Sequence, residues 1–337
     1  MQPHRRSGIL LHPTSLPGPF SIGTLGNECY RFIDFLAASG QSVWQILPLG
    51  PTGFGDSPYS SYSAFAGNPL LICPDQLVRS GDLSANDLQP FLNSCSVVDY
   101  SAATRAQERL LHLACGNFLA ESSPDRKQVF DAFCRDQAYW LNDYAMFRAL
   151  RTHLGDMSWF NWPEALRSRD AATLQTWGNL LHEAIIYHKY SQFVFFNQWL
   201  SVKNYANTRN IKILGDIPIF VAHDSSDVWA NQQLFKLDAS GAPLVVAGVP
   251  PDYFSGTGQR WGNPLYHWDR MAASGFDWWA QRLKWNLTLT DLLRIDHFRG
   301  FAACWEIPAE ETTAINGSWR TVPGDQLFAA LDKELGK

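Results

Sequence analysis

The sequence lacks the features that mark several common classes of protein. Its 337 residues carry 27 basic and 32 acidic side chains, a net charge of −5, so the basic excess typical of nucleic-acid binders is missing. No apolar run approaches the ~18 residues of a membrane span. The apolar stretch at 8–11 is too short for the core of a signal peptide. We therefore expect a cytoplasmic protein that binds neither nucleic acid nor membrane.

Metal-binding and nucleotide-binding patterns are also missing. The six cysteines show no C-x-x-C spacing and have no histidine at zinc-ligand spacing, so we interpret them as small core residues and predict no metal. The G-x-G-x-x-x-G pattern at 256–262 follows a proline-rich loop, where a phosphate cradle needs a preceding strand. His182 and His188 are six residues apart, so on one helix they cannot face the same ion. We expect no cofactor.

Aromatic residues, in contrast, are abundant. Fourteen Trp, 11 Tyr and 21 Phe make up 14% of the chain. A large core absorbs many such rings, but an aromatic face also packs against the C–H face of a sugar. Composition alone leaves both interpretations open, with carbohydrate binding modestly favoured.

Short apolar runs alternate with helical patterns along most of the chain. The runs predict strands at 8–12, 43–47, 211–214 and 291–298. Helical spacing predicts helices at 27–39, 102–119, 128–150, 181–206 and 278–285. Strands separated by helices are typical of a (β/α) barrel or a doubly wound sheet. Proline and glycine at 249–264 predict a loop that also carries tyrosine, phenylalanine and tryptophan.

The chemistry concentrates at the end of the last predicted strand. Side chains alternate along a strand, so Arg294 and Asp296 share one face. A guanidinium beside a carboxylate favours the ionised form, which is ready to act as a nucleophile. A buried structural ion pair is the alternative for these two residues. Asp216 follows the third predicted strand in the equivalent position, and two carboxylates beneath an aromatic loop suit sugar chemistry.

Several motifs carry a more specific resemblance. The segments at 12–18, 57–59, 64–69, 215–221, 258–266 and 294–300 resemble, in the same order, signatures of the 4-alpha-glucanotransferases, also called amylomaltases or disproportionating enzymes. These form glycoside hydrolase family 77 of the alpha-amylase clan. The resemblance runs from residue 8 to about 325 and is weakest in the helical part.

This resemblance implies a fold and a domain organisation. The implied fold is α/β, a (β/α)8 TIM-type barrel with an inserted helical subdomain, of which only about the first four strands are present. Residues 1–73 would supply two barrel strands and a glucan-contacting loop. Residues 74–178 would form the helical insertion, and 179–337 a barrel helix, two further strands and the active-site loop.

The resemblance also implies an activity and a set of residues. The activity is transfer of α-1,4-glucan segments between maltodextrins with retention, through a covalent glucosyl-enzyme on Asp296 that Arg294 keeps ionised. Maltodextrins and amylose would serve as donors and acceptors, and no cofactor is implied. The residues implied for substrate binding are Ser57, Tyr59, Asp216, Trp261 and His297.

One element of the family pattern is missing from the sequence. A retaining mechanism needs a second carboxyl group ~5–5.5 Å from the nucleophile to protonate the leaving oxygen. The family supplies it from a Glu-Asp-Leu-Gly motif after the fifth strand, which these 337 residues do not contain. We therefore expect a chain truncated at its C-terminus and nearly inactive by itself. An alpha-amylase-like hydrolase and a non-catalytic glucan-binding remnant are the alternatives.

Overall fold

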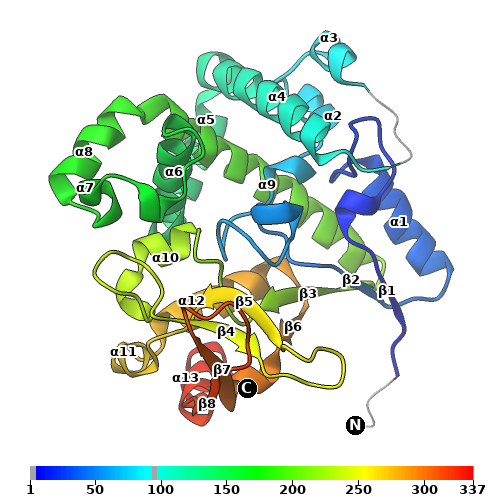
Figure 1. Ribbon diagram of the computed structural model, residues 1–337. Helices are drawn as coiled ribbons and strands as arrows, with labels where there is room; N and C mark the ends of the chain where they lie inside the picture. Colours follow the sequence, from blue (N-terminus) through cyan, green and yellow to red (C-terminus); the bar gives the residue numbers. More distant parts are fainter. Residues whose placement is uncertain (1–4, 93–96, 337) are drawn as a thin grey trace.

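The computed structural model describes residues 5–92 and 97–336. A parallel sheet of four short strands organises the chain: β1 (Gly8–Leu10), β2 (Val43–Gln45), β3 (Lys212–Pro218) and β6 (Leu292–Asp296), in the order β1-β2-β3-β6. Each of the four predicted strands overlaps one of these. Strand β3 extends further than expected and includes Asp216, which therefore lies within the strand and not after it. Figure 1 shows the four strands side by side.

Helices connect and cover these strands. Between β1 and β2, α1 (Asn27–Ala38) buries Cys29, Ile33 and Leu36 on one face, the spacing of an amphipathic helix. Helix α9 (His182–Thr208) precedes β3, and α12 (Asp277–Leu289) precedes β6. Trp199 of α9 is fully buried and donates its indole N–H to the carbonyl of Leu289, which ties α9 to the end of α12. The predicted α/β fold with a parallel sheet is confirmed in this part of the chain.

A group of helices fills the chain between β2 and α9, and it lies in the upper part of Figure 1. Its described residues contain no strand. The helices are α2 (Pro74–Arg79), α3 (Ala85–Leu88), α4 (Tyr100–Glu121), α5 (Pro124–Asp136), α6 (Ala138–His153), α7 (Glu164–Arg167) and α8 (Ala171–Leu180). The single helix predicted at 128–150 is wrong in one respect. Gln137 leaves helical geometry, with φ −99° and ψ 9°, and separates α5 from α6.

A buried ion pair holds this helical group together. The side chain of Asp82 is 1% exposed and accepts two hydrogen bonds of 2.5 Å from the Arg126 guanidinium. The Tyr190 hydroxyl donates to the same carboxylate at 2.8 Å. Because these three residues come from the α2–α3 turn, α5 and α9, the pair joins three segments.

The cysteines are mostly core residues, as the sequence predicted. Of the five that the structure describes, Cys29, Cys73, Cys115 and Cys304 are buried and Cys134 is half-buried. Cys95 lies outside the described residues.

A second sheet, which the sequence did not predict, is antiparallel. It contains β4 (Val245–Val249), β5 (Gln259–Pro264), β7 (Ala303–Pro308) and β8 (Ser318–Thr321), in the order β5-β4-β7-β8. The loop expected at 249–264 is therefore partly wrong, because its last six residues form β5. Gly258 has φ +66°, and a Cβ there would lie 2.4 Å from the Val249 carbonyl oxygen, so the turn requires glycine. The remaining helices are α10 (Ser226–Ala230), α11 (Trp268–Ala273) and α13 (Gly324–Leu335).

Candidate functional site

Strands β3 and β6 bring the three predicted charged residues together. Asp216 is the register partner of Arg294, and Pro218 is the partner of Asp296. Arg294 Nη1 donates to both carboxylate oxygens of Asp216 at 2.8 and 2.7 Å. Its Nη2 donates to Oδ1 of Asp296 at 2.5 Å. One guanidinium therefore bridges two carboxylates, and the three side chains together carry one negative charge.

The two carboxylates differ in their access to solvent. The Asp216 side chain is 1% exposed, whereas Asp296 is 41% and Arg294 is 44% exposed. The ion pair of Arg294 and Asp296, which the sequence left as an alternative, is thus present but is partly exposed. The buried acid that pairs with Arg294 is Asp216. Burial of Arg294 opposes its charge, yet the charges of Asp216 and Asp296 raise its pKa above the usual range. Among the described residues, only Oδ1 of Asp296 accepts a side-chain hydrogen bond, so Oδ2 is available to a ligand.

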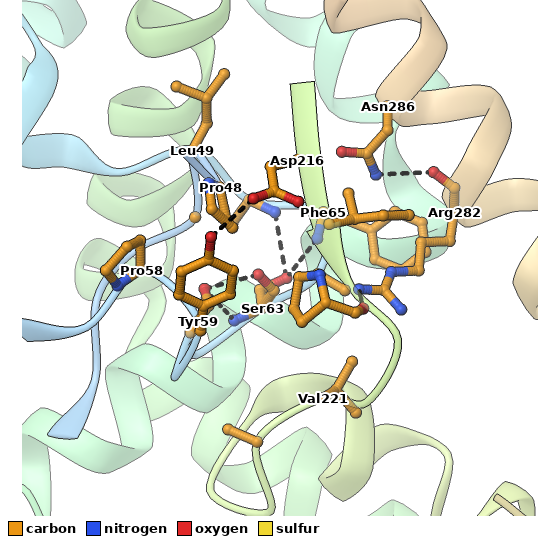
Figure 2. Close-up of a pocket in the computed structure, with 18 of the residues that line it drawn as sticks. Pro48, Leu49, Pro58, Tyr59, Ser63, Phe65, Asp216, Val221, Arg282 and Asn286 are labelled. Atoms are coloured by element: carbon orange, nitrogen blue, oxygen red, sulfur yellow. Dashed lines mark hydrogen bonds between the residues drawn. The ribbon is translucent and has the colours of Figure 1, made fainter. Parts of the chain in front are cut away.

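Tyr59 completes the environment of Asp216. Its hydroxyl donates to Oδ2 of Asp216 at 2.7 Å, as the dashed line in Figure 2 shows. Burial, this hydrogen bond and the negative charge of Asp216 raise the pKa of Tyr59 to about 12. The tyrosine therefore stays protonated at neutral pH and acts as a donor. Both residues also line a small cavity of about 50 Å³ beneath the site.

A larger cleft opens over Asp296. Its volume of about 530 Å³ lies within the range of small-molecule sites. Five of the seven predicted site residues line it, namely Ser57, Tyr59, Trp261, Asp296 and His297. Asp216 and Arg294 are linked to it through hydrogen bonds to Tyr59 and Asp296. Aromatic side chains and a partly exposed carboxylate thus share one concave surface.

His297 has an unusual backbone conformation and a half-buried ring. Its φ of 55° places it in the left-handed region, directly after β6. The Trp261 ring meets the His297 ring edge to face, with centroids 4.9 Å apart. Burial lowers the pKa of His297, and its Nε2 is buried with no hydrogen-bond partner among the described residues. The residue directly after Asp296 therefore carries a buried ring nitrogen that no described group satisfies.

These features coincide with a family match. A family model described as 4-alpha-glucanotransferase matches residues 11–337. The chain belongs to this family. It is 50% identical over 336 residues to the 4-alpha-glucanotransferase of Synechocystis sp., covering 98% of this chain and 66% of that protein. It is 48% identical to the Thermus thermophilus enzyme of the same name, covering 100% and 67%.

A solved structure agrees with this assignment. The amylomaltase from Streptococcus agalactiae in complex with acarbose matches with a TM-score of 0.95 and 43% identity, over 99% of this chain and 68% of that chain. The resemblance predicted from the motifs is therefore confirmed. This chain spans about two thirds of the length of the relatives that it matches.

The cleft of this family member contains further residues that the sequence did not indicate. Asp224 lines the cleft, and its carboxylate accepts hydrogen bonds from Arg151 at 2.6 Å and Ser158 at 2.8 Å. Its neighbour His223 stacks on Phe160, with ring centroids 4.6 Å apart. These partners are 63 to 73 positions away, so local patterns carry no signal for them. The only available indication was that both residues follow the motif at 215–221.

Residues 5–92 and 97–336 contain no group of three or more His, Cys, Asp or Glu side chains able to hold a metal ion. In the same residues, no helix is both long and apolar enough to cross a membrane.

Proposed function

We propose that this chain provides the nucleophile and the sugar-binding cleft of a 4-alpha-glucanotransferase. A free carboxylate oxygen of Asp296 attacks the anomeric carbon of an α-1,4-glucan, and an ester forms as the glycosidic C–O bond breaks. The departing glucan oxygen takes the electron pair and a proton from a general acid outside the described cleft residues. The 4-hydroxyl of a second glucan then attacks the same carbon, returns a proton to the conjugate base of that acid, and releases Asp296. Two displacements at one carbon retain its configuration.

The observation that carries this proposal is the difference between the two carboxylates that share Arg294. Asp216 is buried and accepts hydrogen bonds from Arg294 and Tyr59 on both oxygens. Asp296 accepts from one nitrogen of Arg294 and remains 41% exposed at the cleft. A nucleophile must be reachable by the sugar, and Asp296 is exposed at the cleft whereas the side chain of Asp216 is buried.

The remaining predicted residues suit sugar binding. Trp261 and His297 both line the cleft, and their rings meet edge to face, so Trp261 can stack on a glucose face while His297 contacts the sugar beside it. Tyr59 and Ser57 line the same cleft and belong to the segment 53–62. The structure of the similar Streptococcus agalactiae amylomaltase is a complex with acarbose. We propose α-1,4-glucans such as maltodextrins and amylose as donors and acceptors.

The proton for the leaving group is not supplied by the described cleft residues. Apart from Asp296, the carboxylate lining the described cleft is Asp224, and Arg151 and Ser158 already occupy it. General acid catalysis contributes ~10²–10⁴-fold in rate. We therefore propose that the 337-residue polypeptide alone transfers glucan segments slower than a complete enzyme by at least that factor.

We also propose that the four parallel strands are part of a (β/α)8 barrel, with 74–178 as its helical insertion between the portions 1–73 and 179–337. The parallel register of β1, β2, β3 and β6 supports the barrel, and the run of helices from α2 to α8 supports the insertion. The cytoplasmic location stays a prediction.

A fluorinated α-glucosyl fluoride tests the nucleophile in this chain. Fluoride leaves as an anion with little need for a proton, so the ester can form without the general acid. Mass spectrometry of a digest should find the sugar on Asp296. The variant Asp296→Asn should remain unlabelled, while Asp238→Asn, which changes an exposed aspartate outside the cleft, should be labelled like the wild type. A label on another side chain would refute the proposal.

The two alternative functions have distinct outcomes. A hydrolase would show a net gain of reducing ends from a maltosyl fluoride or maltotriose in proportion to turnover, because water is the acceptor. A transferase would form longer maltodextrins. A glucan-binding protein without chemistry would bind acarbose in calorimetry and acquire no covalent label.

A further inference from the structure

A buried arginine outside the described chemistry lies directly beneath the cleft. Arg282 of α12 is 1% exposed, and its guanidinium donates to the carbonyl of Pro218 at 2.7 Å and to that of Ile219 at 3.2 Å. The Tyr266 hydroxyl donates to the same Ile219 carbonyl at 2.7 Å. These two carbonyls are the point at which β3 ends. Figure 2 shows Arg282 and Asp216 lining the same small cavity.

Burying the charged guanidinium of Arg282 costs free energy, which suggests that the arginine has a role beyond packing. Burial lowers its pKa, and it makes no ion-pair contact of 4 Å or less with a described carboxylate. Its compensation comes from the two carbonyl dipoles, from the more distant charge of Asp227, and from the rings of Trp279 and Trp278, whose centroids lie 4.9 and 5.4 Å away. An apolar side chain of similar volume often stabilises such a position at least as well. What an apolar residue lacks is the fork of donors.

The same helix also holds the segment that carries Tyr59. One turn after Arg282, Trp285 donates its indole N–H to the Phe65 carbonyl at 2.8 Å. The neighbouring amide, Ala64 N–H, donates to the buried carboxylate of Asp227 at 2.8 Å. Helix α12 therefore contacts both structures that position Asp216: the strand on which it lies and the segment that supplies its tyrosine.

We propose that Arg282 is a positioning residue for glucosyl transfer, a role that rests on the function proposed for Asp296. Pro218 is the register partner of Asp296, and Asp216, two residues earlier, holds Arg294. If the Pro218 and Ile219 carbonyls lose their donor, the end of β3 shifts to find water. The hydrogen bonds from Arg294 to Asp216 and Asp296 then change together. A displacement of about 1 Å can cost ~10²-fold in rate.

The test compares two substitutions at Arg282 with one at a partly buried arginine, Arg126. Arg282→Lys keeps the charge but provides no planar fork, and Arg282→Gln removes the charge. Arg126→Lys is the matched control, because Arg126 also donates two hydrogen bonds, to Asp82, but does not line the cleft. For each variant, the maximal rate of labelling by the fluorinated α-glucosyl fluoride and its half-saturating concentration are measured, together with the melting temperature.

We expect the maximal labelling rate to fall by ~10-fold in Arg282→Lys and ~100-fold in Arg282→Gln, with less than ~3-fold change in half-saturation. Arg126→Lys should melt earlier but label at the wild-type rate per folded molecule. If Arg282→Gln does not fold, Tyr266→Phe removes a donor to the same Ile219 carbonyl and should slow labelling by ~3–10-fold. Wild-type labelling rates in folded Arg282→Lys and Tyr266→Phe would overturn the inference. Absence of the label from Asp296 in the wild type would instead overturn the proposed function.

Discussion

The buried carboxyl group of Asp227 makes a testable contribution to the pH dependence of stability. Burial is the main cause that raises its pKa from 3.8 to about 6, against the opposing effects of the Ala64 N–H and of Arg282. In the unfolded chain the group has its ordinary pKa. Between these two values the folded protein holds a proton that the unfolded chain has already released. The free energy of unfolding therefore falls as the pH rises through this window.

The size of this effect follows from the pKa difference. About two pKa units, at about 1.4 kcal/mol for each, amount to about 3 kcal/mol lost between pH 4 and neutral pH. Asp227→Asn removes the titration while the amide oxygen can still accept from Ala64 N–H. The free energy of unfolding of the variant minus that of the wild type should therefore rise by about 3 kcal/mol over this range.

Urea denaturation followed by circular dichroism, at half-unit steps from pH 4 to pH 7.5, measures this difference. The other titrating groups are common to both proteins and cancel when the two curves are subtracted. A difference that stays constant across the range would show that the carboxylate of Asp227 is stabilised by groups that compensate for its burial, and the reasoning would be refuted.

Three further predictions concern stability and can be measured by the same denaturation method. Burial lowers the pKa of His12 from 6.5 to about 4, so stability should fall by about 3 kcal/mol as the pH drops through that range; an equally steep loss in His12→Gln would contradict this. Asp82→Ala should cost about 3 kcal/mol, because it leaves the partly buried Arg126 unpaired; a cost below 1 kcal/mol would show that solvent replaces the pair. Gly241→Ala should cost about 1–3 kcal/mol, because φ is +83° and the new Cβ would lie 2.6 Å from the Trp159 ring; an unchanged midpoint would show that this turn relaxes freely.

The parts of the fold that the sequence predicted are those that local patterns determine. Apolar runs located all four parallel strands, and alternation along a strand placed Arg294 and Asp296 on one face. The hairpin of β4 and β5 was missed because its strand residues include glycine, asparagine and proline. Those residues have low strand propensity, and pairing with β4 stabilises them in spite of it. Gln137 was missed because the helical pattern continues on both sides of it.

The site divides in the same way. The motifs located Tyr59, Asp216, Trp261 and Asp296, but not which carboxylate would be buried, because that depends on how β3 and β6 align and on a tyrosine 157 positions away from Asp216. Arg282 escaped notice for the same reason, since it acts on carbonyl groups 63 and 64 positions earlier. Contacts between distant segments leave no periodic trace in a sequence.

The sharing of Arg294 affects how substitutions of Asp216 should be interpreted. At present two acids compete for one cation, and the buried acid takes the larger share of its hydrogen bonds. Without the carboxylate of Asp216, both Nη atoms of Arg294 can donate hydrogen bonds to Asp296 in a bidentate pair. A carboxylate whose two oxygens both accept hydrogen bonds is a weaker nucleophile. A lower transfer rate in Asp216→Asn would then reflect the weaker nucleophilicity of Asp296 as much as a lost contact to the sugar. The double variant Asp216→Asn with Arg294→Lys would separate the two causes, because a lysine ammonium cannot form the bidentate pair with Asp296.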